Sequence, residues 1–133
     1  MSANLKDANF SGMTLENTQF AGANLENANF EGATLMGCNL KGANLKGAHF
    51  DNATLERSNF YGTKMDHTYF DKSSIEATNF DKSKMKCVYF DDAVIVRSNF
   101  RGVTAHGISL KGSSMSASNK EHAIWETNMD GCK

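Results

Sequence analysis

The stretch Ala23–Phe60 reads ANLEN ANFEG ATLMG CNLKG ANLKG AHFDN ATLER SNF and divides into units of five residues. The third residue of every unit, which we call its central residue, is Leu or Phe, and the first residue is always small. A period of five fits neither an α-helix, whose period is 3.6, nor a flat strand, whose period is 2. The stretch therefore predicts a regular architecture built from five-residue segments.

The same register continues over residues 3–118 without an insertion or a deletion. A second period of 20 residues lies on the first, because every fourth central residue is alike, as in the series Phe10, Phe30, Phe50, Phe70 and Phe90. A fixed repeat implies a solenoid in which each unit contacts only its neighbours. Four segments per 20 residues imply a four-sided coil with side-chain ladders. We therefore expect residues 1–118 to form about five to six coils, a rod of about 25–30 Å.

Glycine recurs two residues after the central residue. A residue that recurs there is expected at a corner of the coil where φ is positive. Between Thr63 and Arg101 the same corner carries other residues, among them Ala77, so we expect a different turn geometry in that zone. Ten of the 11 glycines occupy the corner position: Gly12, Gly22, Gly32, Gly37, Gly42, Gly47, Gly62, Gly102, Gly107 and Gly112.

The segments ANLKD, ANFSG, ANLEN, ANFEG, ATLMG and ANLKG resemble the A(D/N)LXX consensus of the pentapeptide-repeat family, and the resemblance covers residues 3–118. It implies the family's fold, an all-β, right-handed quadrilateral β-helix. In that fold the central residue and the small residue two positions before it point inward. Members with known activity include plasmid quinolone-resistance proteins, which resemble DNA and bind type II topoisomerases. Other members act in differentiation or host interaction, so the resemblance is specific for the fold and not for the function.

Residues 119–133 (NKEHAIWETNMDGCK) form a tail that departs from the pattern. One interpretation is a short capping helix that Asn119 begins and Gly131 ends. Its apolar residues Ile124, Trp125 and Met129 would then cover the last coil. The alternative is one more repeat, with Trp125 as its central residue. No such cover precedes the first coil, so either the chain is a piece of a longer protein or that end pairs with a second copy in a homodimer.

The composition limits the classes of partner. With 15 acidic and 14 basic residues the net charge is −1, and direct nucleic-acid binding, which needs a basic excess, is not expected. No apolar run is long enough for a membrane span, and the N-terminus does not resemble a signal peptide, so we expect no membrane partner. The cysteines Cys38, Cys87 and Cys132 have no CxxC spacing. We interpret them as free thiols in a reducing compartment and expect a cytoplasmic protein.

An acidic column is expected on one side of the rod, because Glu31, Asp51, Asp71 and Asp91 each follow a Phe of the same 20-residue series. One residue before the Phe, the same side carries His49, Tyr69 and Tyr89. Carboxylates beside stacked aromatic rings favour contact with a basic protein surface. The alternative is local charge balance, since Lys72 flanks Asp71 and Arg101 and Lys111 lie further along the rod.

Other polar columns have structural explanations. Asn39, Asn59, Asn79, Asn99 and Asn119 are expected to form an amide ladder. Lys64, Lys84 and Lys86 alternate with Asp66 and are interpreted as balanced surface charge. The four histidines fall on different outward positions, and a regular rod offers no obvious cleft for catalysis. We therefore expect no catalytic residue, no metal and no cofactor.

Three functional hypotheses remain. The first is a non-enzymatic scaffold that binds a protein partner of unknown identity through the acidic and aromatic columns. The second, which the family resemblance implies, is a DNA-mimicking rod that binds a type II topoisomerase such as DNA gyrase. The third is a structural role in self-assembly through a rod end.

Overall fold

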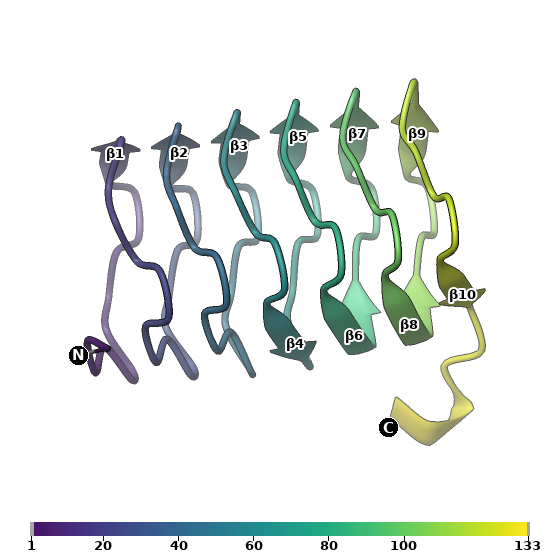
Figure 1. Cartoon of the computed structure of the whole chain (residues 1–133), viewed down its shortest axis with the longest axis horizontal. Coiled ribbons are helices and arrows are strands. Elements are labelled where there is room, and N and C mark those ends of the chain that lie inside the picture. Colours follow the sequence, from purple (N-terminus) through teal and green to yellow (C-terminus); the bar gives the residue numbers. More distant parts are fainter. Residues whose placement is uncertain (1, 133) are drawn as a thin grey trace.

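The chain forms a four-sided parallel β-solenoid of about six coils, as the sequence predicts. The computed structural model describes residues 2–132. Each coil takes 20 residues, and every pairing in the two sheets joins residues 20 positions apart. Figure 1 shows the coils side by side along the long axis, with the N-terminus at one end and the C-terminal segment at the other.

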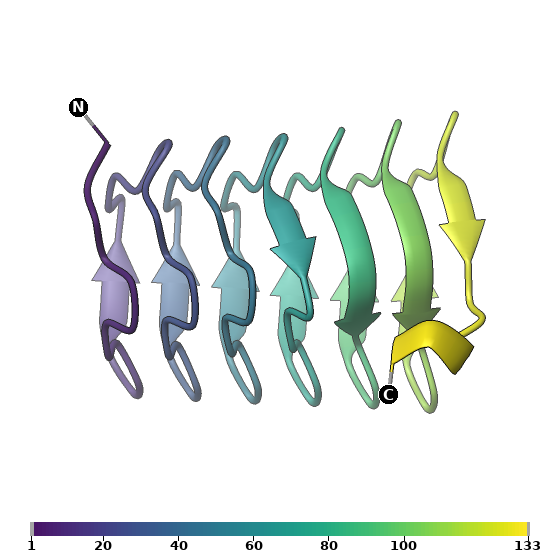
Figure 2. The same ribbon diagram turned by 90° about the horizontal axis from the view of Figure 1, so that it is seen from below.

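Two parallel sheets lie on different sides of the rod, as Figures 1 and 2 show. The first has six three-residue strands: β1 (Thr14–Glu16), β2 (Thr34–Met36), β3 (Thr54–Glu56), β5 (Ser74–Glu76), β7 (Val94–Val96) and β9 (Ser114–Ser116). The second has four strands, in the spatial order β10 (Ile124–Glu126), β8 (Thr104–Ser109), β6 (Lys84–Tyr89) and β4 (Lys64–Asp66). The remaining sides are joined by single bridges such as Asn39↔Asn59 and Tyr69↔Tyr89.

We name the four sides by their central residues. Side A carries Phe10, Phe30, Phe50, Phe70, Phe90 and Leu110. Side B carries Leu15, Leu35, Leu55, Ile75, Ile95 and Met115, the middle residues of the six-stranded sheet. Side C carries Phe20, Leu40, Phe60, Phe80, Phe100 and Lys120. Side D carries Leu5, Leu25, Leu45, Met65, Met85, Ala105 and Trp125, and β6 and β8 run from this side around a corner onto side A.

The core is the inside of the coil, where central residues and the small residues two positions earlier are buried. On side A the rings of Phe30 and Phe50 stack with centroids 4.7 Å apart and planes 3° apart. Side C contributes a second column, whose Phe80 meets Phe70 edge to face at 5.9 Å. Each column therefore repeats at the spacing of the backbone rungs, and aromatic contacts between the columns fill the interior.

Every corner between sides uses the left-handed backbone conformation. The expected positive φ at the corner glycines is confirmed, for example 69° at Gly12. The expected change of turn geometry between Thr63 and Arg101 is wrong, because Ala77 has a φ of 49° and Lys82 one of 63°. Corner N–H groups of both kinds donate to a carbonyl of the next coil, Gly12 to Glu31 at 2.9 Å and Lys82 to Arg101 at 2.8 Å. The ladder therefore imposes the same corner on glycine and non-glycine residues alike.

The C-terminal tail contains one more repeat in place of the expected capping helix. Trp125 lies opposite Ala105 in the pairing of β10 with β8, and Asn119 continues the column of Asn99. The helix beginning at Asn119 is therefore wrong, and the alternative interpretation holds. After β10 the chain makes only a 3-10 turn, η1 (Asp130–Cys132).

The interpretation of the cysteines as free thiols is wrong for two of the three. Cys87 and Cys132 form a disulfide, with Cα atoms 5.4 Å apart, while Cys38 is free and buried. Disulfides persist mainly in oxidising compartments, so the pairing removes the argument from free thiols for a cytoplasmic location. That location stays a prediction.

Candidate functional site

Side A carries the residues predicted to contact a partner, and we call Glu31, Asp51, Asp71, Asp91, His49, Tyr69 and Tyr89 the acidic–aromatic strip. Bridges join His49 to Tyr69 and Tyr69 to Tyr89, so the three rings stand one above another on successive coils. The three rings and the Asp residues are half-buried, whereas Glu31 is exposed. All seven side chains therefore lie on one side of the rod.

The aromatic column is a parallel stack of three rings. His49 and Tyr69 have centroids 4.6 Å apart and planes 5° apart; Tyr69 and Tyr89 have centroids 5.0 Å apart and planes 6° apart. Free aromatic pairs prefer offset or edge-to-face arrangements. The stacking here follows the spacing of the coils, so the strip presents the edges of the rings as a continuous ridge.

The carboxylates of the strip are held in place by the next coil. Asp71 Oδ1 accepts the backbone N–H of Asp91 at 3.0 Å. Asp91 Oδ1 accepts the N–H of Lys111 at 3.1 Å and the hydroxyl of Ser109. In each case one oxygen is fixed by the backbone, which fixes the direction of the other. Asp71 and Asp91 are therefore ordered carboxylates rather than free side chains.

Asp51 differs from the other two aspartates. Its Oδ1 is buried and has no hydrogen-bond partner among the described residues. Its Oδ2 lies 3.4 Å from His49 Nδ1, so a protonated imidazole would form an ion pair with it. An unpartnered buried oxygen is unfavourable, and it makes Asp51 the least satisfied acid of the strip.

The electrostatics of the strip follow from its crowding. Partial burial is the main cause that raises the pKa of Asp71, and the carboxylates of Asp91 and Asp51 raise it further, against the lowering effect of the backbone N–H of Asp91. Burial also raises the pKa of Tyr89, with smaller contributions from Tyr69 and the neighbouring aspartates. A cation placed along the strip would favour ionised Asp71 and relieve the repulsion.

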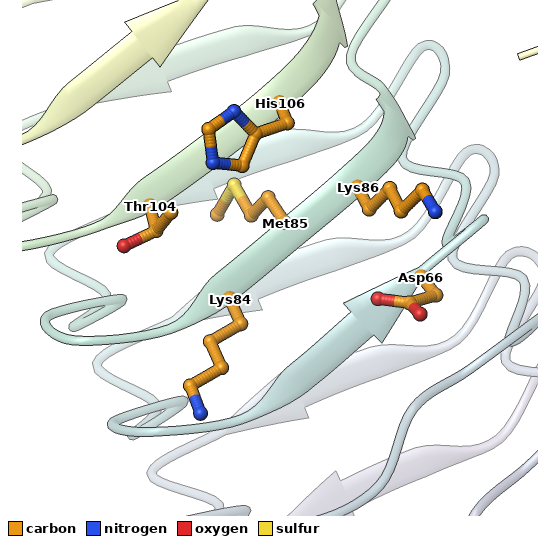
Figure 3. Close-up of a pocket in the computed structure, with 6 residues that line it drawn as sticks. All are labelled: Asp66, Lys84, Met85, Lys86, Thr104 and His106. Carbon is orange, nitrogen blue, oxygen red and sulfur yellow. The ribbon is translucent and has the colours of Figure 1, made fainter. Parts of the chain in front are cut away.

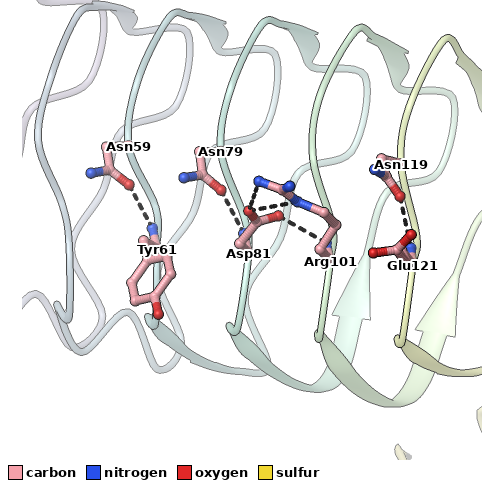
Figure 4. A network of polar contacts seen from close by, with 7 residues as sticks. All are labelled: Asn59, Tyr61, Asn79, Asp81, Arg101, Asn119 and Glu121. Atoms are coloured by element: carbon pink, nitrogen blue, oxygen red, sulfur yellow. Dashed lines mark hydrogen bonds and ion pairs between the residues drawn. The ribbon is translucent and has the colours of Figure 1, made fainter.

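Side C shows two ways of satisfying the same backbone donor. Asn59 Oδ1 accepts the N–H two residues later, at Tyr61, and most members of the asparagine column do the same (Figure 4). At Arg101 the acceptor is Asp81 Oδ1, from the previous coil, at 2.8 Å. The asparagine column therefore has a structural role, although its hydrogen bonds go to the local backbone and not from one amide of the column to the next. Side A shows both arrangements. Asn29 Oδ1 accepts the N–H two residues later, and Asp71 and Asp91 each accept an N–H of the next coil.

Asp81 and Arg101 form an ion pair that sequence reasoning missed. The guanidinium donates from Nε at 3.1 Å and from Nη2 at 2.8 Å to Asp81 Oδ2, and the carboxylate holds the pKa of Arg101 above its ordinary value. Asp81 is buried, whereas Arg101 is exposed. Figure 4 shows the contact between them. The signal was present in the sequence, because Asp81 follows Phe80 as Asp71 follows Phe70. The pair neutralises an aspartate on side C, whereas within residues 2–132 no cationic side chain is paired with Asp71 or Asp91 on side A.

The lysine group lies on side D beside a shallow hollow. Lys84 and Lys64 are in register, and Asp66 lies opposite Lys86. The hollow of about 200 Å³ is lined by Asp66, Lys84, Met85, Lys86, Thr104 and His106. The side chains of Lys84 and Lys86 point in different directions (Figure 3). His106 Nδ1 lies 2.7 Å from Glu126 Oε1, so the imidazole and the carboxylate are in direct contact. Among the described residues no ion pair joins Asp66 to the lysine group, so balanced surface charge stays a prediction.

Of the three residues predicted to cover the rod end, only Trp125 packs against the buried core. Its ring meets Phe100 edge to face at 5.6 Å, and Lys120 Nζ lies 4.9 Å from its centroid. Ile124 is 49% exposed, and Met129 is half-buried in the segment after β10. At the other end Phe10 is only half-buried.

Residues 2–132 contain no group of three or more His, Cys, Asp or Glu side chains arranged to hold a metal ion. Within the same range there is no helix with the length and apolarity needed to span a membrane. The expected absence of metal, cofactor and membrane partner stays a prediction.

A solenoid with a five-residue repeat and four sides defines a class of repeat protein. The model of the pentapeptide repeat region matches residues 3–80, and the chain belongs to the pentapeptide-repeat family. None of the curated proteins compared matches it.

Two solved structures show the same fold. Rfr23, a pentapeptide repeat protein from the cyanobacterium Cyanothece 51142, has a TM-score of 0.58 and 18% identity, over 94% of this chain and 89% of that one. A trypsin-treated variant of QnrB1, a plasmid-mediated fluoroquinolone resistance protein, has a TM-score of 0.58 and 16% identity, over 95% of this chain and 84% of that one.

Proposed function

We propose that this chain is a non-enzymatic scaffold whose acidic–aromatic strip binds a basic surface of a protein partner. The observation that carries the proposal is the alignment of three stacked rings with the carboxylates of Asp51, Asp71 and Asp91 on one side of the rod, two of which are held by backbone N–H groups. Aromatic side chains are enriched at protein interfaces and complementary charge steers association. Elsewhere on the rod, acidic side chains such as Glu56, Glu76 and Asp81 pair with arginine within the chain.

The test is a triple substitution that removes the charges and keeps the side-chain oxygens that accept backbone N–H groups. The substitutions are Asp51→Asn, Asp71→Asn and Asp91→Asn. At positions 71 and 91 an asparagine Oδ1 accepts the same N–H groups as the aspartate it replaces, whereas Asp51 Oδ1 accepts none. The matched control removes three charges from side B, at Glu16, Glu56 and Glu76. Binding to host proteins would be measured by affinity capture, and each captured partner then titrated as a purified protein.

The proposal expects a partner that binds the wild type and the side B variant equally and binds the side A variant at least tenfold more weakly. The affinity for that partner should also fall steeply with salt. Equal binding by all three proteins, or no purified partner that binds, would overturn the proposal.

A second candidate function is a DNA-mimicking rod that binds a type II topoisomerase such as DNA gyrase. The observation in its favour is a column of carboxylates from successive coils, on a rod whose fold is similar to that of QnrB1. The near-zero net charge of −1 weakens it, because a DNA mimic needs a dominant negative field. The test is a DNA supercoiling assay with purified gyrase that a fluoroquinolone inhibits. Relief of inhibition by the wild type, lost in the side A variant, would favour this function.

A further inference from the structure

The segment after β10 is attached to the rod in an unusual way. It runs back beside β8 on side D, and η1 brings Cys132 to Cys87 of β6, 45 positions earlier in the chain (Figure 2). Its hydrogen bonds are local: Asp130 N–H donates to Asn128 Oδ1 and Cys132 N–H to the Met129 carbonyl, both at 2.9 Å. Among the described residues, no hydrogen bond or ion pair joins residues 127–132 to the coils.

Packing adds little to this attachment. Within residues 127–132 only Met129 and Cys132 are half-buried, and the other four residues are exposed. Met129 is not among the apolar residues that pack against the core. Because neither polar bonds nor core burial holds the segment, the disulfide is its main tether.

The segment nevertheless covers a defined part of the rod surface. Of all corner positions in residues 2–132, only Cys87 and Gly107 are buried, whereas corners such as His67 are exposed. A Cβ at Gly107 would lie 2.8 Å from Cys132 Sγ and 3.3 Å from the Asn128 carbonyl oxygen. The segment therefore covers two corners, and glycine at one of them leaves the room that it needs.

Beneath the segment lies a groove of about 300 Å³. The rod contributes Lys86, His106 and Glu126 to its lining, and the segment contributes Asn128, Asp130, Gly131 and Cys132. If the segment left, one wall of the groove would be lost and Cys87 would become accessible from side D.

We propose that residues 127–132 are a latch on side D that the Cys87–Cys132 disulfide closes and an external thiol opens. A thiolate of the reductant attacks Cys132 Sγ, the less buried sulfur, and breaks the S–S bond, and Cys87 leaves as a thiolate that takes up a proton. A second thiol of the reductant then releases Cys132 as a thiol. Two protein thiols and one reductant disulfide result, and the latch loses its tether.

The test is NMR relaxation on the full 133-residue chain, oxidised and after treatment with dithiothreitol. In the oxidised protein the backbone order parameters of residues 127–132 should be near 0.85, and after reduction they should fall below about 0.6. The β8 residues 104–109 should stay rigid in both states. Cys132→Ser should resemble the reduced protein without reductant, and Cys38→Ser, which removes the buried free thiol, should resemble the wild type.

A second readout is alkylation of the folded, reduced protein with iodoacetamide. An open latch exposes Cys87 and Cys132 to the reagent while Cys38 stays unreacted. Order parameters that do not change after complete reduction would overturn the proposal, and so would a Cys87 that reacts as slowly as Cys38. The proposal would also fail if both thiols stayed free in the air-oxidised protein.

Discussion

At the scale of single residues, Asp71 shows how a regular fold concentrates charge. Its position on side A places it between Asp51 and Asp91, and burial together with these neighbours raises its pKa above the ordinary value of 3.8. A raised pKa means that folding favours the protonated form. The contribution of Asp71 to stability is therefore fully present below about pH 3.8 and is lost as the pH rises through the raised pKa.

This linkage predicts that Asp71→Asn stabilises the protein at neutral pH. Asparagine keeps the acceptor for the Asp91 N–H and removes the repulsion. The gain should be below about 1 kcal/mol, because the strip is screened by solvent, and it should shrink as the pH approaches 3.8. Thermal melts between pH 3 and 7 measure it. Asp66→Asn, at the equivalent position on side D opposite Lys86, is the control and should bring no gain.

Corner residues make a second prediction at this scale. Ala77 has a φ of 49°, a conformation that disfavours residues with a Cβ, whereas Gly32 has a φ of 68° and open space around it. Ala77→Gly should therefore raise the free energy of unfolding by about 0.5–1 kcal/mol, and Gly32→Ala should lower it by a similar amount. Urea unfolding measures both. A loss of stability in Ala77→Gly would show that the corner does not strain the alanine.

At the scale of elements, the phenylalanine columns act as the cohesive part of the rod. Phe70 is fully buried and stacks with Phe50 at 5.0 Å and with Phe90 at 4.8 Å. Phe70→Ala should lower the free energy of unfolding by about 3–5 kcal/mol, because it leaves a cavity in the column. Phe10→Ala, at the half-buried end of the same column, should cost clearly less. Equal melting temperatures for Phe70→Ala and the wild type would contradict the stacked column.

The sequence predicted these elements well because the register has no insertion. A fixed distance of 20 residues determines which side chains stack, so the columns of the strip and of the asparagine ladder were predictable from position alone. The orientation of the carboxylates was not, since it depends on a backbone N–H in the next coil, as between Asp71 and Asp91. The strip was thus predictable in its members and not in its hydrogen bonding.

At the scale of the whole molecule, the sequence-based predictions failed where the structure depends on contacts between coils, which the residue types alone do not reveal. The corner of Ala77 resembles the glycine corners because ladder hydrogen bonds impose its φ. Trp125 joins the last rung although its neighbours in sequence depart from the repeat. The disulfide has no spacing motif, because Cys132 reaches Cys87 only through the path of the chain after β10. Each of these features depends on contacts between coils.

The two ends of the rod should differ in local stability. Each coil contacts only its neighbours, so an end coil has one interface instead of two. At the C-terminal end the Cys87–Cys132 disulfide ties the last coils together, whereas no such tether is present in the described part of the first coil. We therefore expect the solenoid to open from its N-terminal end.

Hydrogen exchange of two matched amides tests this asymmetry. Phe10 N–H donates to the Asn29 carbonyl at 2.7 Å, and Phe50 N–H donates to the Tyr69 carbonyl at the same distance, so the two bonds differ in their place along the rod and not in length. The Phe10 amide should exchange roughly tenfold faster or more, because opening the first coil breaks one interface. Equal exchange would mean that another surface covers the first coil. A second copy of the chain would then be the explanation if dilution restored fast exchange and light scattering showed a dimer.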